Sequence, residues 1–149
     1  MSTILLVSSQ GGHWIQLKRL TKAFQGHQIN YLSVAKTPPV FDNKNGEKYY
    51  SVTDATRKHK LQLVRQFFQV AKVVFYVHPN LIVTTGSSVG LMCLIWGKII
   101  GCRTVWLDSI ANYERLSMSG RLAKPFATHH LTQWPHLQKG KTKYIGAVI

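Results

Sequence analysis

Acidic residues are scarce in this sequence. Five Asp and Glu stand against nineteen Lys and Arg among 149 residues, which gives a formal net charge of +14 at pH 7. This excess favours an anionic partner: nucleic acid, a phosphorylated substrate or an anionic membrane surface. The sequence has no zinc-finger spacing, no RNP aromatic motif and no recognition-helix pattern. Nucleic acid is therefore not expected as a partner.

Cysteines and long apolar runs are also lacking. Cys93 and Cys102 are the only cysteines, and their spacing fits neither a disulfide framework nor a metal site. The most apolar stretch, 89–100, contains two glycines and a lysine and falls short of the roughly 20 residues that span a bilayer. The opening MSTILLVSSQ lacks the basic segment of a signal peptide. We expect no metal, reduced thiols in a cytosolic protein, and at most peripheral membrane contact.

What is present indicates one packed domain over residues 1–149. Hydrophobic residues make up 45% of the chain, enough for a core at this length. Helical patterns alternate with short apolar runs, and this alternation predicts an α/β fold with a Rossmann-like, doubly wound, mainly parallel sheet. The expected strands lie at 4–7, 28–34, near Tyr49, 81–83, 104–107 and 143–149. The expected helices run from Trp14 to about Gly26, from 61 to 77 and from 88 to 100.

The first candidate binding loop is SSQGGHW, which follows the first strand directly. Gly11 and Gly12 allow a ligand to approach the backbone closely, and the following helix start favours an anion. Ser9 lies at the strand end, and His13 at the rim is a side chain that accepts a proton near neutral pH. The alternative is a tight turn that carries an incidental histidine. The loop lacks the G-x-G-x-x-G dinucleotide motif, and the chain has no Walker A sequence and no D-x-D pair.

A second loop, TTGSSVG, repeats the arrangement after the strand at 81–83. Gly86, Ser87 and Ser88 precede an apolar helix, so free backbone amides and small side chains again lie at a strand end. Ser88 has the alternative role of a helix N-cap. Two such loops at two strand ends predict an anion site more strongly than either does alone.

The third candidate loop follows the strand at 104–107. Asp108 is suited to act as a general base, as an orienter of His13 or as an acceptor for sugar hydroxyls, and the alternative is a structural loop carboxylate. Ser117 and Ser119 stand before Gly120. They suit either an anion cradle or the cap of a following helix.

The helix at 61–77 is the candidate membrane surface. Its polar residues, Gln66 among them, form one stripe and leave a wide apolar arc that includes Phe67 and Phe68. The run RKHK before it carries Arg57, Lys58 and Lys60. A basic, aromatic-rich helix suits the headgroup region of an anionic membrane. The alternative is a core helix with a solvated charge run.

Together these motifs resemble one family. SQGGHWIQL, TTGSSVG, GKIIGCRTVWLDS and SMSGRLAKPFATHHLTQWPHL are similar to ordered motifs of the asparagine-linked glycosylation fourteen family and its bacterial PssD-type relatives, as is the closing KYIGAVI. The resemblance covers nearly the whole chain. It implies the N-terminal half of a split GT-B glycosyltransferase, similar in layout to MurG.

The resemblance also implies a function. The chain would be a subunit that transfers a sugar from a UDP-sugar to a polyprenyl-diphosphate-linked acceptor in capsule or exopolysaccharide synthesis, peripherally, on the cytoplasmic face of the membrane. A separate donor-binding subunit would hold the UDP-sugar, with no further cofactor. His13 and Asp108 are the catalytic candidates, although Asp108 stands where relatives often carry Glu. Gln133, Trp134 and the terminal strand are expected to face the partner. The alternative is a non-catalytic membrane scaffold that recruits the catalytic partner.

Overall fold

The computed structural model describes residues 2–36, 46–56 and 58–148. Within them, seven parallel strands form one sheet in the order β3-β2-β1-β4-β5-β6-β7. The strands are β1 (Thr3–Val7), β2 (Gln28–Ser33), β3 (Lys48–Ser51), β4 (Leu81–Thr84), β5 (Arg103–Leu107), β6 (His129–Thr132) and β7 (Thr142–Tyr144). The predicted Rossmann-like fold, with its mainly parallel sheet, is confirmed.

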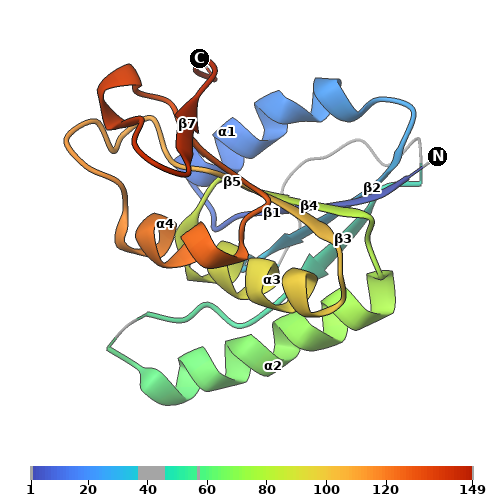
Figure 1. Cartoon of the computed structure of the whole chain (residues 1–149). Coiled ribbons are helices and arrows are strands. Elements are labelled where there is room, and N and C mark those ends of the chain that lie inside the picture. The colour runs from blue at the N-terminus through green and yellow to red at the C-terminus, as the bar shows by residue number, and fades with distance from the viewer. Residues whose placement is uncertain (1, 37–45, 57, 149) are drawn as a thin grey trace.

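Helices cover the two faces of the sheet unequally (Figure 1). One face carries α1 (Gly12–Leu20), which continues as the 3-10 helix η1 (Thr21–Phe24). The other face carries α2 (Lys60–Val77), α3 (Ser87–Ile99) and the short α4 (Met118–Ala123). Two further 3-10 turns, η2 (Lys124–Phe126) and η3 (Pro135–Leu137), flank β6 in sequence. Among the described residues, three α-helices therefore lie on one face of the sheet and one on the other.

The core divides at the sheet because side chains of a strand alternate between its faces. Leu5 and Val7 of β1 pack into a cluster with α2 and α3. Ile4 and Leu6 pack into a second cluster with α1. Both sets are almost fully buried, which explains why β1 is a continuous apolar run rather than an alternating one.

Two glycines let α3 lie close to the sheet. A Cβ atom at Gly90 would lie 2.1 Å from Oγ1 of Thr84, and one at Gly97 would lie 2.6 Å from Cδ1 of Ile82. Any larger residue at either position would push the helix away from β4. The start of α3 is thereby held at the end of that strand.

The structure corrects the sequence prediction at the last two strands of the sheet. Strand β6 was not expected, because HHLT carries only one aliphatic residue. Its inward side chains are polar but satisfied: Nδ1 of His130 lies 2.9 Å from Oγ1 of Thr142, and its Nε2 lies 2.6 Å from the Gly120 carbonyl. The expected terminal strand 143–149 is shorter than predicted and ends at Tyr144.

The polar stripe predicted for the surface of α2 is not wholly exposed. Gln66 is fully buried. Its Nε2 donates to the Thr53 carbonyl at 2.8 Å, and its Oε1 accepts from Ser88 at 3.1 Å. The periodic pattern assigned Gln66 to the solvent side, but these bonds hold it against the loop before α2 and the start of α3.

No helix among the described residues is both long enough and apolar enough to cross a bilayer.

Candidate functional site

The predicted loops meet where the strand order reverses. β2 and β4 flank β1, and in open α/β sheets ligands bind at the carboxyl ends of strands beside such a reversal. A cavity of about 630 Å³ opens there. Five of the predicted site residues line it: His13, Ser87, Ser88, Ser117 and Ser119.

Two contacts with Thr85 fix His13. Its Nδ1 lies 2.9 Å from the Thr85 carbonyl oxygen, and the Thr85 hydroxyl donates to the His13 carbonyl at 2.6 Å. A carbonyl oxygen only accepts, so Nδ1 carries the proton and Nε2 of the neutral ring is an acceptor. The orienter of His13 is thus the backbone of Thr85 and not Asp108, which corrects one of the roles considered for that carboxylate.

The backbone beside His13 adopts rare conformations. Gly86 has φ of 132°, and Ser87 has φ of 79°, a left-handed value that non-glycine residues seldom adopt. Such conformations cost roughly 1–3 kcal/mol and cluster at functional sites. They stand at the start of α3, where Ser87 and Ser88 line the cavity beside His13.

The predicted serines have different partners. The Ser88 hydroxyl donates to Gln66. Ser117 is the N-cap of α4, since its hydroxyl accepts from the Gly120 amide at 2.9 Å. The helix-cap role is therefore confirmed for Ser117, and Ser119, two residues later in α4, also lines the cavity.

Asp108 lies beneath the cavity and does not line it. Only 1% of it is exposed. Oδ1 accepts from Nε1 of Trp106 at 3.1 Å and from the Ser117 hydroxyl at 2.7 Å, while Oδ2 accepts from the Ser117 amide at 3.1 Å and from Nδ2 of Asn112 at 3.2 Å. This is the arrangement of a structural carboxylate that holds the loop between β5 and α4. It leaves His13 as the better placed base.

The remaining residues of the first loop, Ser9, Gly11 and Gly12, do not line the cavity. Gly11 and Gly12 are exposed, and a Cβ on either would meet no atom within 4 Å. Gly11 is nevertheless needed for its φ of 78° at the N-cap of α1. The Ser9 carbonyl accepts from the Ser8 hydroxyl at 2.8 Å. The diphosphate-binding role of these three residues stays a prediction.

Gln133 is not the partner-facing residue that we expected. It is 2% exposed, and its Nε2 donates to Gln16 at 2.6 Å and to the Asp108 carbonyl at 3.0 Å. Its Oε1 accepts from the Val148 amide at 2.7 Å. Gln133 therefore ties the chain end to α1 and to the loop after β5. The neighbouring Trp134 is half-buried, and its Nε1 donates to the Ile110 carbonyl.

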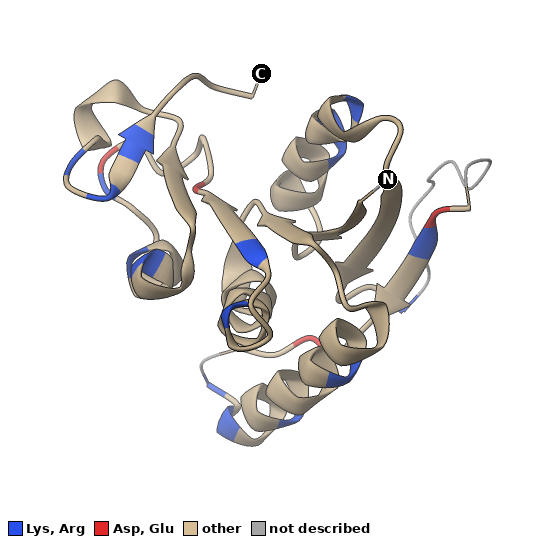
Figure 2. Cartoon of the chain, turned by 45° about the vertical axis from the view of Figure 1, so that its right-hand side comes forward, with Lys and Arg blue, Asp and Glu red and all other residues tan. Residues whose placement is uncertain are grey.

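The candidate membrane-facing residues on and before α2 lie in different environments. Phe67 packs on Trp96 with ring centroids 4.7 Å apart, so it faces α3, in contrast to the expectation that it faces the membrane. Phe68 is 56% exposed. Lys58 and Lys60 are exposed, and Arg57 lies outside the described residues. Figure 2 shows further Lys and Arg along α2 and on α4.

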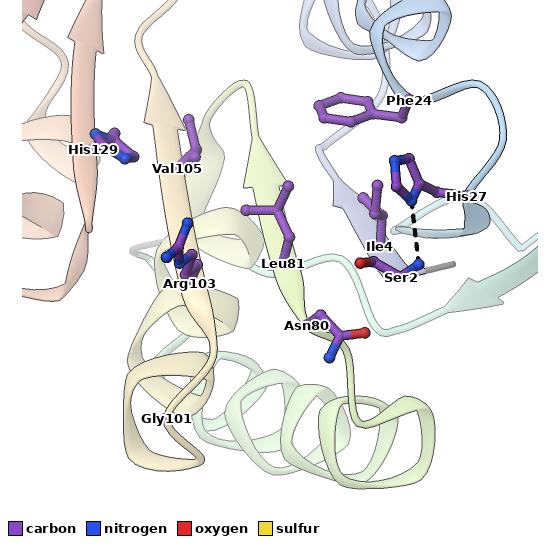
Figure 3. A pocket seen from close by; sticks show the side chains of 10 residues that line it. All are labelled: Ser2, Ile4, Phe24, His27, Asn80, Leu81, Gly101, Arg103, Val105 and His129. Atoms are coloured by element: carbon purple, nitrogen blue, oxygen red, sulfur yellow. Dashed lines mark hydrogen bonds between the residues drawn. The ribbon is translucent and has the colours of Figure 1, made fainter.

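A second cavity, of about 720 Å³, lies at the opposite edge of the sheet (Figure 3). Ile4, Leu81 and Val105 form its floor, with Arg103 and His129 on one side and His27 on the other. None of the predicted site residues lines it. Because it lies at the amino ends of the strands, it is not at the edge where open α/β sheets bind their ligands.

Within the described part of the chain, no group of three or more His, Cys, Asp or Glu is placed to hold a metal ion. The thiols are also unreactive in character, because burial raises the pKa of Cys93 well above its usual value and that of Cys102 to about 11.

Three residues of the site were not anticipated from the sequence. Thr85 orients His13, Asn112 bonds Asp108, and Gln16 joins Ser109 to Gln133. Each lies next to a strand end or on the first helix, but a polar residue in such a place has no distinctive spacing. The arrangement therefore offers a histidine ring of fixed orientation, whose Nε2 can accept a proton. This ring lies beside a cavity that is lined by several serines, among them the first two residues of α3.

Comparisons with known proteins identify a family that this chain matches. A family model described as "Oligosaccharide biosynthesis protein Alg14 like" matches residues 47–148. The UDP-N-acetylglucosamine transferase subunit ALG14 of Eremothecium gossypii is 31% identical over 87 residues, which cover 53% of this chain and 39% of that protein. The subunit of the same name from Rattus norvegicus is 21% identical, over 98% of this chain and 82% of that protein.

Solved structures with the same fold include sugar transferases. MurG of Acinetobacter baumannii superposes with a TM-score of 0.79 at 12% identity, over 100% of this chain and 46% of that one. The UDP-GlcNAc 2-epimerase of Methanocaldococcus jannaschii gives 0.63 at 11% identity, over 97% and 45%. The chain thus spans about half of each, and the likeness shows a Rossmann-like fold of the kind found in one half of a GT-B enzyme. With the family model covering most of its length, the chain belongs to the Alg14-like family of oligosaccharide biosynthesis proteins.

Proposed function

We propose that this chain is the acceptor-binding subunit of a glycosyltransferase. It moves a sugar from a UDP-sugar to a polyprenyl-diphosphate-linked acceptor in cell-surface polysaccharide synthesis. The observation that carries the proposal is the fixed His13 ring, whose Nδ1 donates to Thr85 and whose Nε2 is left as an acceptor at the cavity. Membership of a family whose relatives are named UDP-N-acetylglucosamine transferase subunits supports the donor class.

In the proposed step, the acceptor gains the sugar and loses a proton, and UDP is released. The acceptor hydroxyl attacks the anomeric carbon while its proton passes to Nε2 of His13. The bond between that carbon and the nucleotide oxygen breaks, and UDP leaves with the electron pair. A positioned general base of this kind contributes typically 10²- to 10⁴-fold in rate. The amides at the start of α3 and the nearby serines bind the acceptor diphosphate and hold the hydroxyl in place.

A separate donor-binding subunit is part of the proposal. The name of the relatives describes them as subunits, which supports a second chain. The carboxyl edge of the sheet, where the cavity opens, is the surface that the donor-binding subunit would close. Sugar transfer would then require both chains.

Attachment to the cytoplasmic face of the membrane completes the proposal. Leu61, Val64 and Phe68 are exposed along one stripe of α2, and Lys58 and Lys60 lie at its start. Cations near an anionic leaflet contribute about 1 kcal/mol each. Phe68→Ser should therefore weaken binding to vesicles that contain anionic lipid, while Phe67→Ser should mainly lower stability.

The test is sugar transfer from a panel of UDP-sugars to a short-chain polyprenyl-diphosphate-linked sugar. It compares this chain alone, the donor-binding subunit from the same genome alone, and the two together. Transfer only by the mixture supports the proposal. Transfer by this chain alone would contradict the requirement for a partner.

One observation favours a second function, that of a non-catalytic scaffold. Asp108, one of two catalytic candidates, is buried and accepts four hydrogen bonds, so fewer reacting groups remain on this chain. A scaffold would recruit the partner to the membrane through α2. It predicts full transfer by a His13→Ala complex and lost recruitment on changing Phe68.

A further inference from the structure

The cavity beside His13 is lined by two chemically distinct sets of residues. The polar set supplies hydroxyls, an amide and the His13 ring: His13, Ser87, Ser88, Ser109, Asn112, Ser117 and Ser119. The apolar set comes from three helices, with Leu63 of α2, Leu91 and Met92 of α3, and Met118 and Leu122 of α4. No Asp or Glu is among the lining residues. The lining thus combines hydrogen-bonding groups with hydrocarbon and carries no negative charge, which suits a ligand that has an anionic part and an apolar part.

The apolar end continues along α3. Ser88, Leu91, Met92, Ile95 and Ile99 have the spacing of one helical stripe, and none of the five is fully buried. From Leu91 to Ile99 the helix rises about 12 Å at 1.5 Å per residue. The residues on the opposite side of α3, Val89 and Cys93 among them, are buried against the sheet. The cavity together with this partly exposed stripe, which runs along α3 between α2 and α4, is called the groove below.

The flanking helices extend the same apolar character to the surface. On α2, Leu61, Val64 and Phe68 are exposed; on α4, Met118 and Leu122 are exposed. Both helices lie on the α3 face of the sheet (Figure 1). Exposed apolar side chains on the two helices that flank α3 are more than scattered surface residues. The groove thus combines hydrogen-bonding groups beside His13 with exposed apolar side chains on both flanking helices.

We infer that this groove, on α3 between α2 and α4, holds the first part of the aliphatic chain of the acceptor, next to its diphosphate. The inference rests on the proposed function for the nature of the acceptor. A linear amphiphile matches both kinds of lining: phosphate at the serines beside His13, hydrocarbon over Leu91 and Met92, and the remaining chain at the exposed residues of α2 and α4. The apolar lining offers a peptide no hydrogen-bonding side chain, which favours a hydrocarbon as its occupant.

The consequence is that the chain of the acceptor contributes to affinity within the protein as well as in the membrane. Burial of only part of one isoprene unit is enough for about a tenfold gain in affinity. Affinity should therefore rise from pyrophosphate to geranyl diphosphate and again to farnesyl diphosphate, and stop rising once the groove is full.

The methionines provide a direct probe of the site. The chain has three, and two of them, Met92 and Met118, line the cavity. With ¹³C-methyl methionine, titration of farnesyl diphosphate into the full chain should shift both signals and leave that of Met1 unchanged. Pyrophosphate should bind at least tenfold more weakly than farnesyl diphosphate. Farnesol, which lacks the anionic end, should also bind more weakly.

Matched variants separate the groove from general surface hydrophobicity. Leu122 and Ile15 are 56% and 53% exposed helical residues on opposite faces of the sheet. Leu122→Ser should weaken farnesyl diphosphate binding about tenfold without changing pyrophosphate binding, and Ile15→Ser should change neither. The Ile15→Ser protein also shows whether loss of an exposed apolar side chain alone alters the methionine signals.

Several outcomes would overturn the inference: equal affinity for pyrophosphate and farnesyl diphosphate, equal affinity for farnesol, or unchanged Met92 and Met118 signals. Failure of the proposed function looks different. Groove-dependent binding of farnesyl diphosphate without sugar transfer by the complex would keep the groove and remove the reaction. Transfer that is equally efficient to short and long acceptors would keep the reaction and remove the groove.

Discussion

The ring of His13 lies directly against the backbone of Gly86. A Cβ atom at position 86 would be 2.9 Å from Cε1 and 3.0 Å from Nδ1 of His13, closer than real Cβ atoms approach such groups. The loop after β4 therefore positions the imidazole ring. The Thr85 carbonyl orients the ring, and the absent side chain of Gly86 makes room for it.

Gly86→Ala should displace His13. The added methyl collides with the ring, and the φ of 132° is unfavourable for alanine. We expect sugar transfer by the complex to fall at least about tenfold and the free energy of unfolding to fall by roughly 1–3 kcal/mol. Urea denaturation and steady-state transfer measure the two effects.

Gly101→Ala is the matched control. Gly101 also has a positive φ, of 79°, but a Cβ there meets no atom within 4 Å. Its variant should lose stability and keep its activity per folded molecule. Equal losses of activity in the two variants would show that backbone strain, and not contact with His13, explains the effect of Gly86→Ala.

Asp108→Asn tests whether the buried carboxylate is structural. An amide replaces one acceptor oxygen by a donor, so at least one of the four donors around Asp108 loses its acceptor. We expect the free energy of unfolding to fall by about 1–3 kcal/mol, with activity per folded molecule largely kept. A stable variant that no longer transfers sugar would restore Asp108 as a catalytic residue.

Acid should weaken the β6 region through His130. Burial lowers the pKa of this imidazole from its ordinary value of 6.5, so the folded state favours the neutral ring. The unfolded chain binds the proton more readily, and the resulting stability is present above pH 6.5 and is lost as the pH falls toward the folded pKa. Urea denaturation at pH 7.5 and 5.5 should show this loss, and His130→Gln should reduce it. An unchanged pH dependence in that variant would assign the loss to other groups.

The sequence predicts the layout of the sheet and the place of the site well, and the partners of individual side chains poorly. Apolar runs such as ILLV identify buried strands because parallel strands are covered on both faces. Glycine-containing loops after two of those strands then identify the edge where His13 lies. Neither step needs knowledge of long-range contacts.

Buried polar residues are where pattern reasoning fails. Gln66, Gln133 and His130 have polar side chains, and periodicity assigns such residues to the surface. Each is buried because specific partners satisfy it: Thr53 and Ser88, Gln16 and the Asp108 carbonyl, Gly120 and Thr142. Those partners lie from 10 to 117 positions away, so a local pattern does not reveal them.

The most direct measurement of the central claim is the rate of sugar transfer by the complex of this chain with its donor-binding subunit, with and without His13→Ala. The ring makes one bond to Thr85, through Nδ1, whereas the bond from the Thr85 hydroxyl to the His13 carbonyl does not depend on the imidazole. The variant should therefore fold and assemble normally while kcat falls about 10²- to 10⁴-fold. A folded, assembled His13→Ala complex with undiminished kcat would contradict a base on this chain and leave it as the scaffold of a catalyst that lies wholly on the partner.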